Sequence, residues 1–173
     1  MVLRVREQHS IFTLPKTKGD INMPETKRIL LIEADSHEAE LITAGLVECC
    51  LSNHIDLVRD GEEALDYLHK RGQYADRIGG HPVVILLALR LPKIDGREVL
   101  RRLKTTEKIN CIPVVVFTAS KAEQDIIQGY AYGANSYVIK PFDAHSLFEI
   151  IKNIGIYWTM VSEPPPVDKC KIA

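Results

Sequence analysis

The stretch VVILLALRLPKIDG, residues 83–96, decides the fold class of this chain. Its first half, residues 83–89, is apolar without alternation, which is typical of a strand buried on both faces of a parallel sheet. A loop over residues 91–96 follows, and the spacing of apolar residues then predicts a helix from Gly96 to Thr105. A buried strand followed at once by a helix is the repeating unit of an α/β sheet.

The same unit recurs on both sides of this stretch. Strands are predicted at residues 29–32, 54–59, 83–89, 112–118 and 136–139. Helices are predicted at residues 36–51, 60–70, 96–105, 121–132 and 143–155. Four helix starts resemble capping boxes, with a Glu three residues after Asp35, Asp60, Asp95 or Ser120. With right-handed crossovers, this order predicts a doubly wound five-stranded parallel α/β sheet.

The ends of the chain differ in composition from this middle part. Residues 1–26 are predicted to be an N-terminal tail, residues 27–153 the domain, and residues 154–173 a C-terminal extension. The net charge of -1 gives no reason to expect nucleic acid or an anionic membrane as a partner. No apolar run is long enough to span a membrane or to serve as a signal peptide. The four cysteines form no CxxC pattern, so we expect reduced thiols in a cytoplasmic protein.

The functional site is expected where the carboxyl ends of the parallel strands meet. Four motifs reach that edge in order: ILLIEAD (29–35), LPKIDG (91–96), PVVVFTAS (113–120) and YVIKPF (137–142). Together they resemble the receiver domain of two-component response regulators, over about residues 27–153. The resemblance implies the flavodoxin-like receiver fold. It also implies an Asp that accepts a phosphoryl group from a kinase histidine, beside an acidic pair that helps to bind Mg²⁺.

On this resemblance, the phosphoacceptor position is Ala88, the acidic pair is Glu33 and Ala34, and the metal-facing carbonyl is that of Arg90. An alanine methyl has no lone pair to attack phosphorus, and Mg²⁺ requires oxygen donors that the alanines lack. We therefore expect no metal, no cofactor and no enzymatic activity. The alternative is a conventional phosphoacceptor that uses a displaced acid, Asp35, although a helix-capping role also explains that residue.

The groups that hold and report the phosphoryl group in the family are retained. The resemblance assigns the hydroxyl to Thr118, the lysine to Lys140 and the switch aromatic to Tyr137. Each also has a structural explanation, because Thr118 could satisfy local backbone groups and Tyr137 could be a half-buried strand aromatic. A buried Lys140 needs a partner, and we expect a salt bridge to Glu33.

A narrower resemblance points to the single-domain regulators of bacterial phytochromes. It is carried by DGREVLRRLK (95–104), by the long loop RGQYADRIGGHP (71–82), and by IYW (156–158) before a proline run. It implies a homodimer and a light-regulated sensor histidine kinase, a bacteriophytochrome, as upstream partner. The apolar residues expected to contact the second subunit or another partner are Ile154, Ile156, Tyr157, Trp158, Met160 and Val161. The alternative is that this segment folds back on its own domain and caps the last helix.

The function expected from these observations is that of a single-domain response regulator that acts through phosphorylation-independent protein–protein interaction. No DNA-binding domain is expected after the last helix, so output is expected to pass through a partner. A small-molecule-binding flavodoxin-like protein is a further alternative. It is disfavoured because Glu33-Ala34-Asp35 stands where a glycine-rich phosphate loop would be needed.

Overall fold

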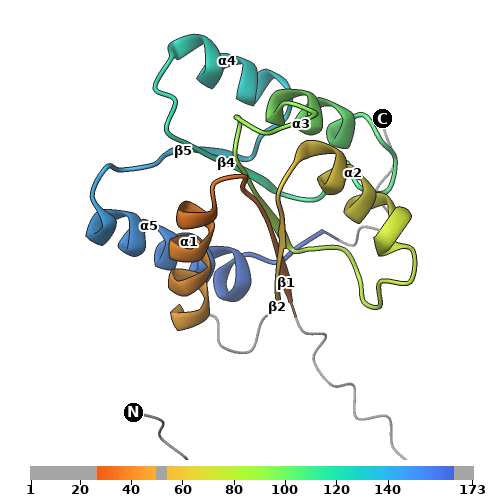
Figure 1. The fold of residues 1–173 in the computed structure, drawn as a ribbon, viewed down its shortest axis with the longest axis horizontal. Coiled ribbons are helices and arrows are strands. Elements are labelled where there is room, and N and C mark those ends of the chain that lie inside the picture. The colour runs from red at the N-terminus through yellow and green to blue at the C-terminus, as the bar shows by residue number, and fades with distance from the viewer. Residues whose placement is uncertain (1–26, 50–53, 166–173) are drawn as a thin grey trace, which may run out of the picture.

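The computed structural model describes residues 27–49 and 54–165, which form a parallel sheet with helices on both faces (Figure 1). The strands are β1 (Arg28–Ile32), β2 (His54–Val58), β3 (Val84–Leu87), β4 (Val114–Thr118) and β5 (Ser136–Ile139). The helices are α1 (Ser36–Cys49), α2 (Gly61–His69), α3 (Gly96–Lys104), α4 (Glu123–Ala131) and α5 (Ala144–Ile156), with short turns η1 (Gly72–Tyr74) and η2 (Tyr157–Val161). The strand order is β2-β1-β3-β4-β5, so the predicted doubly wound five-stranded sheet is confirmed. The predicted tail, residues 1–26, lies outside the described residues.

Alternate residues of the central strands belong to two separate hydrophobic cores. Leu30 and Ile32 of β1 belong to the core beneath α2 and α3, whereas Ile29 and Leu31 belong to the core beneath α1 and α5. Figure 1 shows the same division, with α1 and α5 together on one side of the sheet and α2, α3 and α4 on the other. Every residue of β3 is buried, as the unbroken apolar run in the sequence predicts.

The helix starts confirm three of the four predicted caps and correct the fourth. The carboxylates of Asp35, Asp60 and Asp95 accept backbone N–H bonds from the first helical turn at 2.8–2.9 Å. Ser120 does not cap α4, whose N-cap is Ala122 without a side-chain hydrogen bond. The Ser120 hydroxyl donates to Asp125 at 2.5 Å and accepts the backbone N–H of Ala122 at 3.4 Å, so it contacts the N-cap residue rather than an N–H group of the first helical turn.

The helical segment at the end of the domain is longer than the sequence predicts. The last helix was expected at residues 143–155, but α5 runs on to Ile156 and continues as a π-helical turn, η2. The helical spacing of Ile151, Ile154 and Trp158 explains the result, because all three contact the core beneath α1 and α5. Part of the predicted C-terminal extension therefore belongs to the packed domain.

The cysteines give a further correction. Cys111, which precedes β4, is disulfide-bonded, so the expectation of a reduced thiol is wrong for this residue. Spacing along the chain shows whether cysteines form a CxxC motif but not which ones meet in space. Cys111 therefore does not support the inference of a reducing compartment from cysteine usage.

Candidate functional site

The carboxyl ends of β1, β3, β4 and β5 converge on one pocket of about 480 Å³. The residues that line it are Glu33, Ala34, Asp35, Glu38, Ala88, Arg90, Thr118, Ala119 and Lys140. The fold thus brings together the predicted phosphoacceptor, acidic-pair, hydroxyl and lysine positions. Tyr137, the predicted switch aromatic, does not line the pocket.

Ala88 lies directly after β3 and lines this pocket. It is buried, and its backbone N–H donates to the carbonyl of Ile32 at 3.0 Å, which continues the pairing of β3 with β1. The chain then turns so tightly that a Cβ on Gly96 would come within 2.2 Å of the Ala88 carbonyl oxygen. The backbone at the end of the central strand is thus fixed by close packing, and it carries a methyl group rather than a carboxylate.

Lys140 is the best-anchored polar side chain of the pocket. Its ammonium lies 2.5 Å from Oε2 of Glu33, and both residues are buried, so the predicted salt bridge is confirmed. A second carboxylate, that of Glu38 in the first turn of α1, also accepts a hydrogen bond from the Lys140 ammonium. From the sequence, Glu38 was assigned only a role at the start of a helix. Its contact with Lys140 could have been expected, because the first turn of α1 lies at the same sheet edge as Lys140.

The donor set of this pocket does not fit the Mg²⁺ ion that the receiver resemblance implies. Glu33 and Glu38 are both engaged by Lys140, and Asp35 caps α1 from an exposed position. Ala34 and Ala88 offer no side-chain oxygen. No cluster of three potential metal-binding side chains occurs within residues 27–49 and 54–165. A cation here would have to displace an ammonium that already neutralises the carboxylates.

Thr118 and Tyr137 are connected through the loop after β4. The buried Thr118 hydroxyl accepts the backbone N–H of Ser120 at 3.3 Å, and the Tyr137 hydroxyl donates to the Ser120 carbonyl at 3.2 Å. The Tyr137 ring packs against α4, where a Cβ on Gly129 would lie 3.0 Å from it. Burial raises the pKa of the Tyr137 hydroxyl. Tyr137 is therefore both a half-buried strand aromatic and a contact to the loop that a switch would move.

A polar network that the sequence did not reveal holds the same loop. Asp125 of α4 accepts hydrogen bonds from the Ser120 hydroxyl and, at 2.6 Å, from the Arg97 guanidinium of α3. These two donors lower the pKa of the Asp125 carboxyl, the Ser120 bond contributing more. The network joins α3, α4 and the β4–α4 loop without any contribution from a phosphoryl group.

The predicted partner-contact residues divide into two groups. Ile156, Tyr157, Met160 and Val161 expose apolar side chains, with 64% of Met160 accessible. Trp158 is partly buried and packs on the core of its own domain. The Lys27 ammonium also holds this segment by donating to the Thr159 carbonyl at 2.7 Å.

The fold and this pocket define a receiver domain, and a comparison with protein families agrees. The response regulator receiver domain family matches residues 29–152, and the chain belongs to that family. Among curated relatives, a probable methanogenesis regulatory protein, FilR2, of Methanothrix harundinacea is 39% identical, covering 75% of this chain and 82% of its own. The response regulator Rcp1 of Synechocystis is 36% identical, covering 76% of this chain and 88% of its own.

Solved structures point the same way. The phosphorylated cyanobacterial phytochrome response regulator RcpA superposes with a TM-score of 0.77 at 38% identity, covering 81% of this chain and 99% of its own. The chain is thus related to phytochrome response regulators. No helix of residues 27–49 and 54–165 has the length and apolar character required to cross a membrane.

Proposed function

We propose that this receiver domain works in phytochrome-linked two-component signalling through protein–protein contacts that do not depend on phosphorylation. The observation that carries the proposal is Ala88, which lies at the carboxyl end of β3 where the family resemblance expects the phosphoacceptor aspartate. Without a carboxylate there is no nucleophile for phosphoryl transfer, and without metal the transferring charge is poorly compensated. The protein is a binding partner rather than an enzyme in this proposal.

The occupied Lys140 ammonium supports the same conclusion. In the family, this lysine contacts phosphoryl oxygens, but here two carboxylates already accept its hydrogen bonds. The pair Glu33 and Glu38 therefore gives the lysine the neutralisation that a phosphorylated aspartate would otherwise supply. A sensor histidine kinase of the bacteriophytochrome kind is the proposed upstream partner, because RcpA is described as a phytochrome response regulator.

The competing function is a conventional regulator that is phosphorylated on Asp35. Asp35 is exposed at the rim of the pocket, and its Oδ1 accepts the Glu38 backbone N–H at 2.8 Å. It follows β1 rather than β3, and phosphorylation there would remove an acceptor that caps α1. This function is distinguished from the proposed one by a single labelling experiment.

The test is incubation with acetyl phosphate and Mg²⁺, and separately with a phosphorylated histidine kinase. We expect no acid-stable, base-labile label on the wild-type chain, and the same result for Asp35→Asn. A label that Asp35→Asn abolishes would replace the proposal with the competing function. Co-purification of the unlabelled chain with the kinase completes the test, since binding that requires prior phosphorylation would also contradict the proposal.

A further inference from the structure

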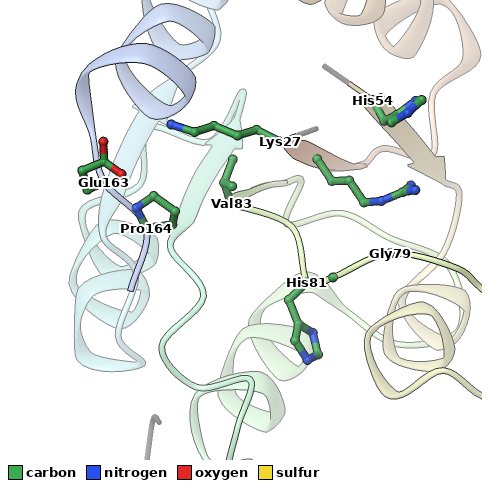
Figure 2. A pocket seen from close by; sticks show the side chains of 9 residues that line it. Lys27, His54, Gly79, His81, Val83, Glu163 and Pro164 are labelled. Atoms are coloured by element: carbon green, nitrogen blue, oxygen red, sulfur yellow. The ribbon is translucent and has the colours of Figure 1, made fainter. Parts of the chain in front are cut away.

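The pocket at the edge where the strands begin, of about 370 Å³, does not bring its cationic side chains together. Figure 2 shows the Lys27 side chain extending toward Glu163 and Pro164. The Lys27 ammonium donates to η2, whereas the guanidinium of Arg28, the next residue, donates to β2. Cations that are held by separate elements define no common binding site. A closer gathering of polar groups lies in the loop between β4 and α4.

Ser120, in this loop, has all of its polar groups engaged. Its backbone N–H donates to the Thr118 hydroxyl at 3.3 Å, and its carbonyl accepts the Tyr137 hydroxyl at 3.2 Å. Its own hydroxyl donates to Asp125 at 2.5 Å and accepts the Ala122 N–H at 3.4 Å. A single residue therefore bonds the loop to the end of β4, to β5 and to α4.

The carboxylate of Asp125 joins this loop to α3, which lies beside α4 (Figure 1). Its Oδ2 accepts the Ser120 hydroxyl, and its Oδ1 accepts Nη2 of Arg97 at 2.6 Å. Asp95, the N-cap of α3, accepts the other terminal nitrogen of Arg97 at 3.1 Å. Hydrogen bonds between ionised groups are among the strongest in proteins. Arg97, Asp125 and Ser120 form the Asp125 network.

The position of the loop decides what Thr118 and Tyr137 can do. On the receiver resemblance, Thr118 would hold a phosphoryl oxygen and Tyr137 would be the switch aromatic. Movement of Ser120 would break its bonds to Tyr137 and to Asp125. Asp125 cannot follow Ser120 without losing Arg97, which holds its other carboxylate oxygen. Every displacement of the loop thus costs at least one charge-assisted hydrogen bond.

We propose that the Asp125 network is a built-in restraint that holds the β4–α4 loop in one conformation without a phosphoryl group. It keeps the Tyr137 hydroxyl on the Ser120 carbonyl and fixes the start of α4 relative to α3. The proposal rests on the proposed function in one respect, because a partner that binds independently of phosphorylation requires a surface that is already ordered. Its test uses neither a kinase nor a phosphoryl donor, so the restraint and the proposed function can fail separately.

The test is amide hydrogen exchange of the full chain, resolved by residue with NMR at constant pH. The Ser120 and Ala122 amides report on the loop. The Ile85 amide, which donates to the Pro113 carbonyl at 2.9 Å within the sheet, reports on unfolding of the whole domain. We expect Arg97→Gln to accelerate exchange at Ser120 and Ala122 about tenfold and to leave Ile85 unchanged, because a charge-assisted bond that restrains only the loop is lost.

Matched controls separate the network from a general loss of charge. Arg101→Gln removes a guanidinium from an exposed ion pair on the same helix, and Glu123→Ala removes an exposed carboxylate from the first turn of α4. Both should exchange as the wild type. Asp125→Ala removes the acceptor of both donors, so it should accelerate loop exchange at least as much as Arg97→Gln. Adding Arg97→Gln to Asp125→Ala should bring no further acceleration, because Arg97 acts through Asp125.

The Tyr137 ring gives a second measurement in the same samples. Its resonances should broaden or double in Arg97→Gln, because the hydroxyl loses the Ser120 carbonyl in part of the population, and they should stay single in Arg101→Gln. Wild-type loop exchange with unchanged Tyr137 resonances in Arg97→Gln would overturn the proposal. Equal acceleration in the controls or at Ile85, or further acceleration in the double variant, would also overturn it.

Discussion

The ammonium of Lys140 lies 2.5 Å from the carboxylate of Glu33, and more than nine-tenths of each side chain is inaccessible to solvent. The two residues are 107 positions apart, so the contact ties the end of β5 to the end of β1. Glu38 is the third member of the group, but 41% of its side chain is exposed. The two carboxylates therefore differ in the dielectric environment in which they meet the same cation.

This difference predicts unequal costs for removing the three charges. Lys140→Met leaves Glu33 buried without its cation and should lower the free energy of unfolding by about 3–5 kcal/mol. Glu33→Gln should cost a similar amount, whereas Glu38→Gln at the exposed rim should cost no more than about 1 kcal/mol. Urea denaturation at neutral pH measures all three. Equal costs for Glu33→Gln and Glu38→Gln would contradict the distinction drawn between the buried and the exposed pair.

The donor set around Ala88 predicts that Mg²⁺ has no effect on stability. A ligand at a hundredfold excess over its dissociation constant would add about 2.7 kcal/mol. We expect the melting temperature to be the same with EDTA and with millimolar Mg²⁺. A clear rise with Mg²⁺ would show that Glu33 or Asp35 leaves its partner for the metal.

Restoring the carboxylate should reverse this behaviour. Ala88→Asp adds a fourth carboxylate to a pocket that already holds Glu33, Asp35 and Glu38 beside the single ammonium of Lys140, so like-charge repulsion should destabilise the metal-free protein. Addition of Mg²⁺ should then recover part of the loss. Ala88→Asn is the matched control, because it has nearly the same volume but no charge. If Mg²⁺ does not change the stability of the Ala88→Asp variant, the geometry of the carboxylates, rather than the missing acid, excludes the metal.

The Asp125 network predicts a component of stability that depends on pH. Because the folded pKa of Asp125 lies below its ordinary value of 3.8, the folded state binds fewer protons than the unfolded state in this range. Its contribution is therefore complete above about pH 3.8 and is lost as the pH falls through the lower folded pKa. Asp125→Asn should lack this acid-dependent component, while Asp76→Asn, which changes an exposed carboxylate, should keep it. Identical acid denaturation of wild type and Asp125→Asn would rule out the contribution.

The features that could be predicted from the sequence are those that depend on local patterns. The unbroken apolar run of β3 and the carboxylate caps at Asp60 and Asp35 depend on neighbours within a few residues. The Glu38 contact with Lys140 spans 102 positions, and no local pattern reports it. Glu33 could be predicted as the partner of Lys140 because a buried lysine requires a partner. The same argument does not say how many carboxylates contact the lysine, so Glu38 was missed.

The same limit explains the error at Ser120 and the early end predicted for the last helix. A serine three residues before Glu123 matches a cap, but α4 begins after Ala122, and the Ser120 hydroxyl donates to Asp125, which itself pairs with Arg97 on another helix. The helix expected to end at residue 155 continues into η2 because Ile154 and Trp158 pack against the core. In both cases the deciding contacts are tertiary, and no local pattern reports them.

The exposed apolar side chains of η2 predict a homodimer. Tyr157, Met160 and Val161 are each more than half accessible, on a turn that the Lys27 bond to Thr159 and the Trp158 contact with the core hold in place. A rigid apolar surface of this kind is the composition of an interface anchor, and a two-fold dimer would use it on both chains. Light scattering at micromolar concentration should give about twice the chain mass of 19.5 kDa.

The variant that tests this dimer must leave the packed side of the segment intact. Truncation after Asn153 would also remove Ile154 and Trp158 from the core, so a monomer obtained that way could reflect partial unfolding. The double variant Met160→Glu and Val161→Ser changes only exposed side chains and should yield a monomer with an unchanged melting temperature. Ile78→Glu is the matched control, because Ile78 is 87% exposed on the loop before β3, outside η2, and should leave the mass doubled. The dimer is proposed to be independent of phosphorylation, so acetyl phosphate should not alter the measured mass. A wild-type chain that is monomeric under these conditions, or a double variant that stays dimeric, would remove η2 from the interface.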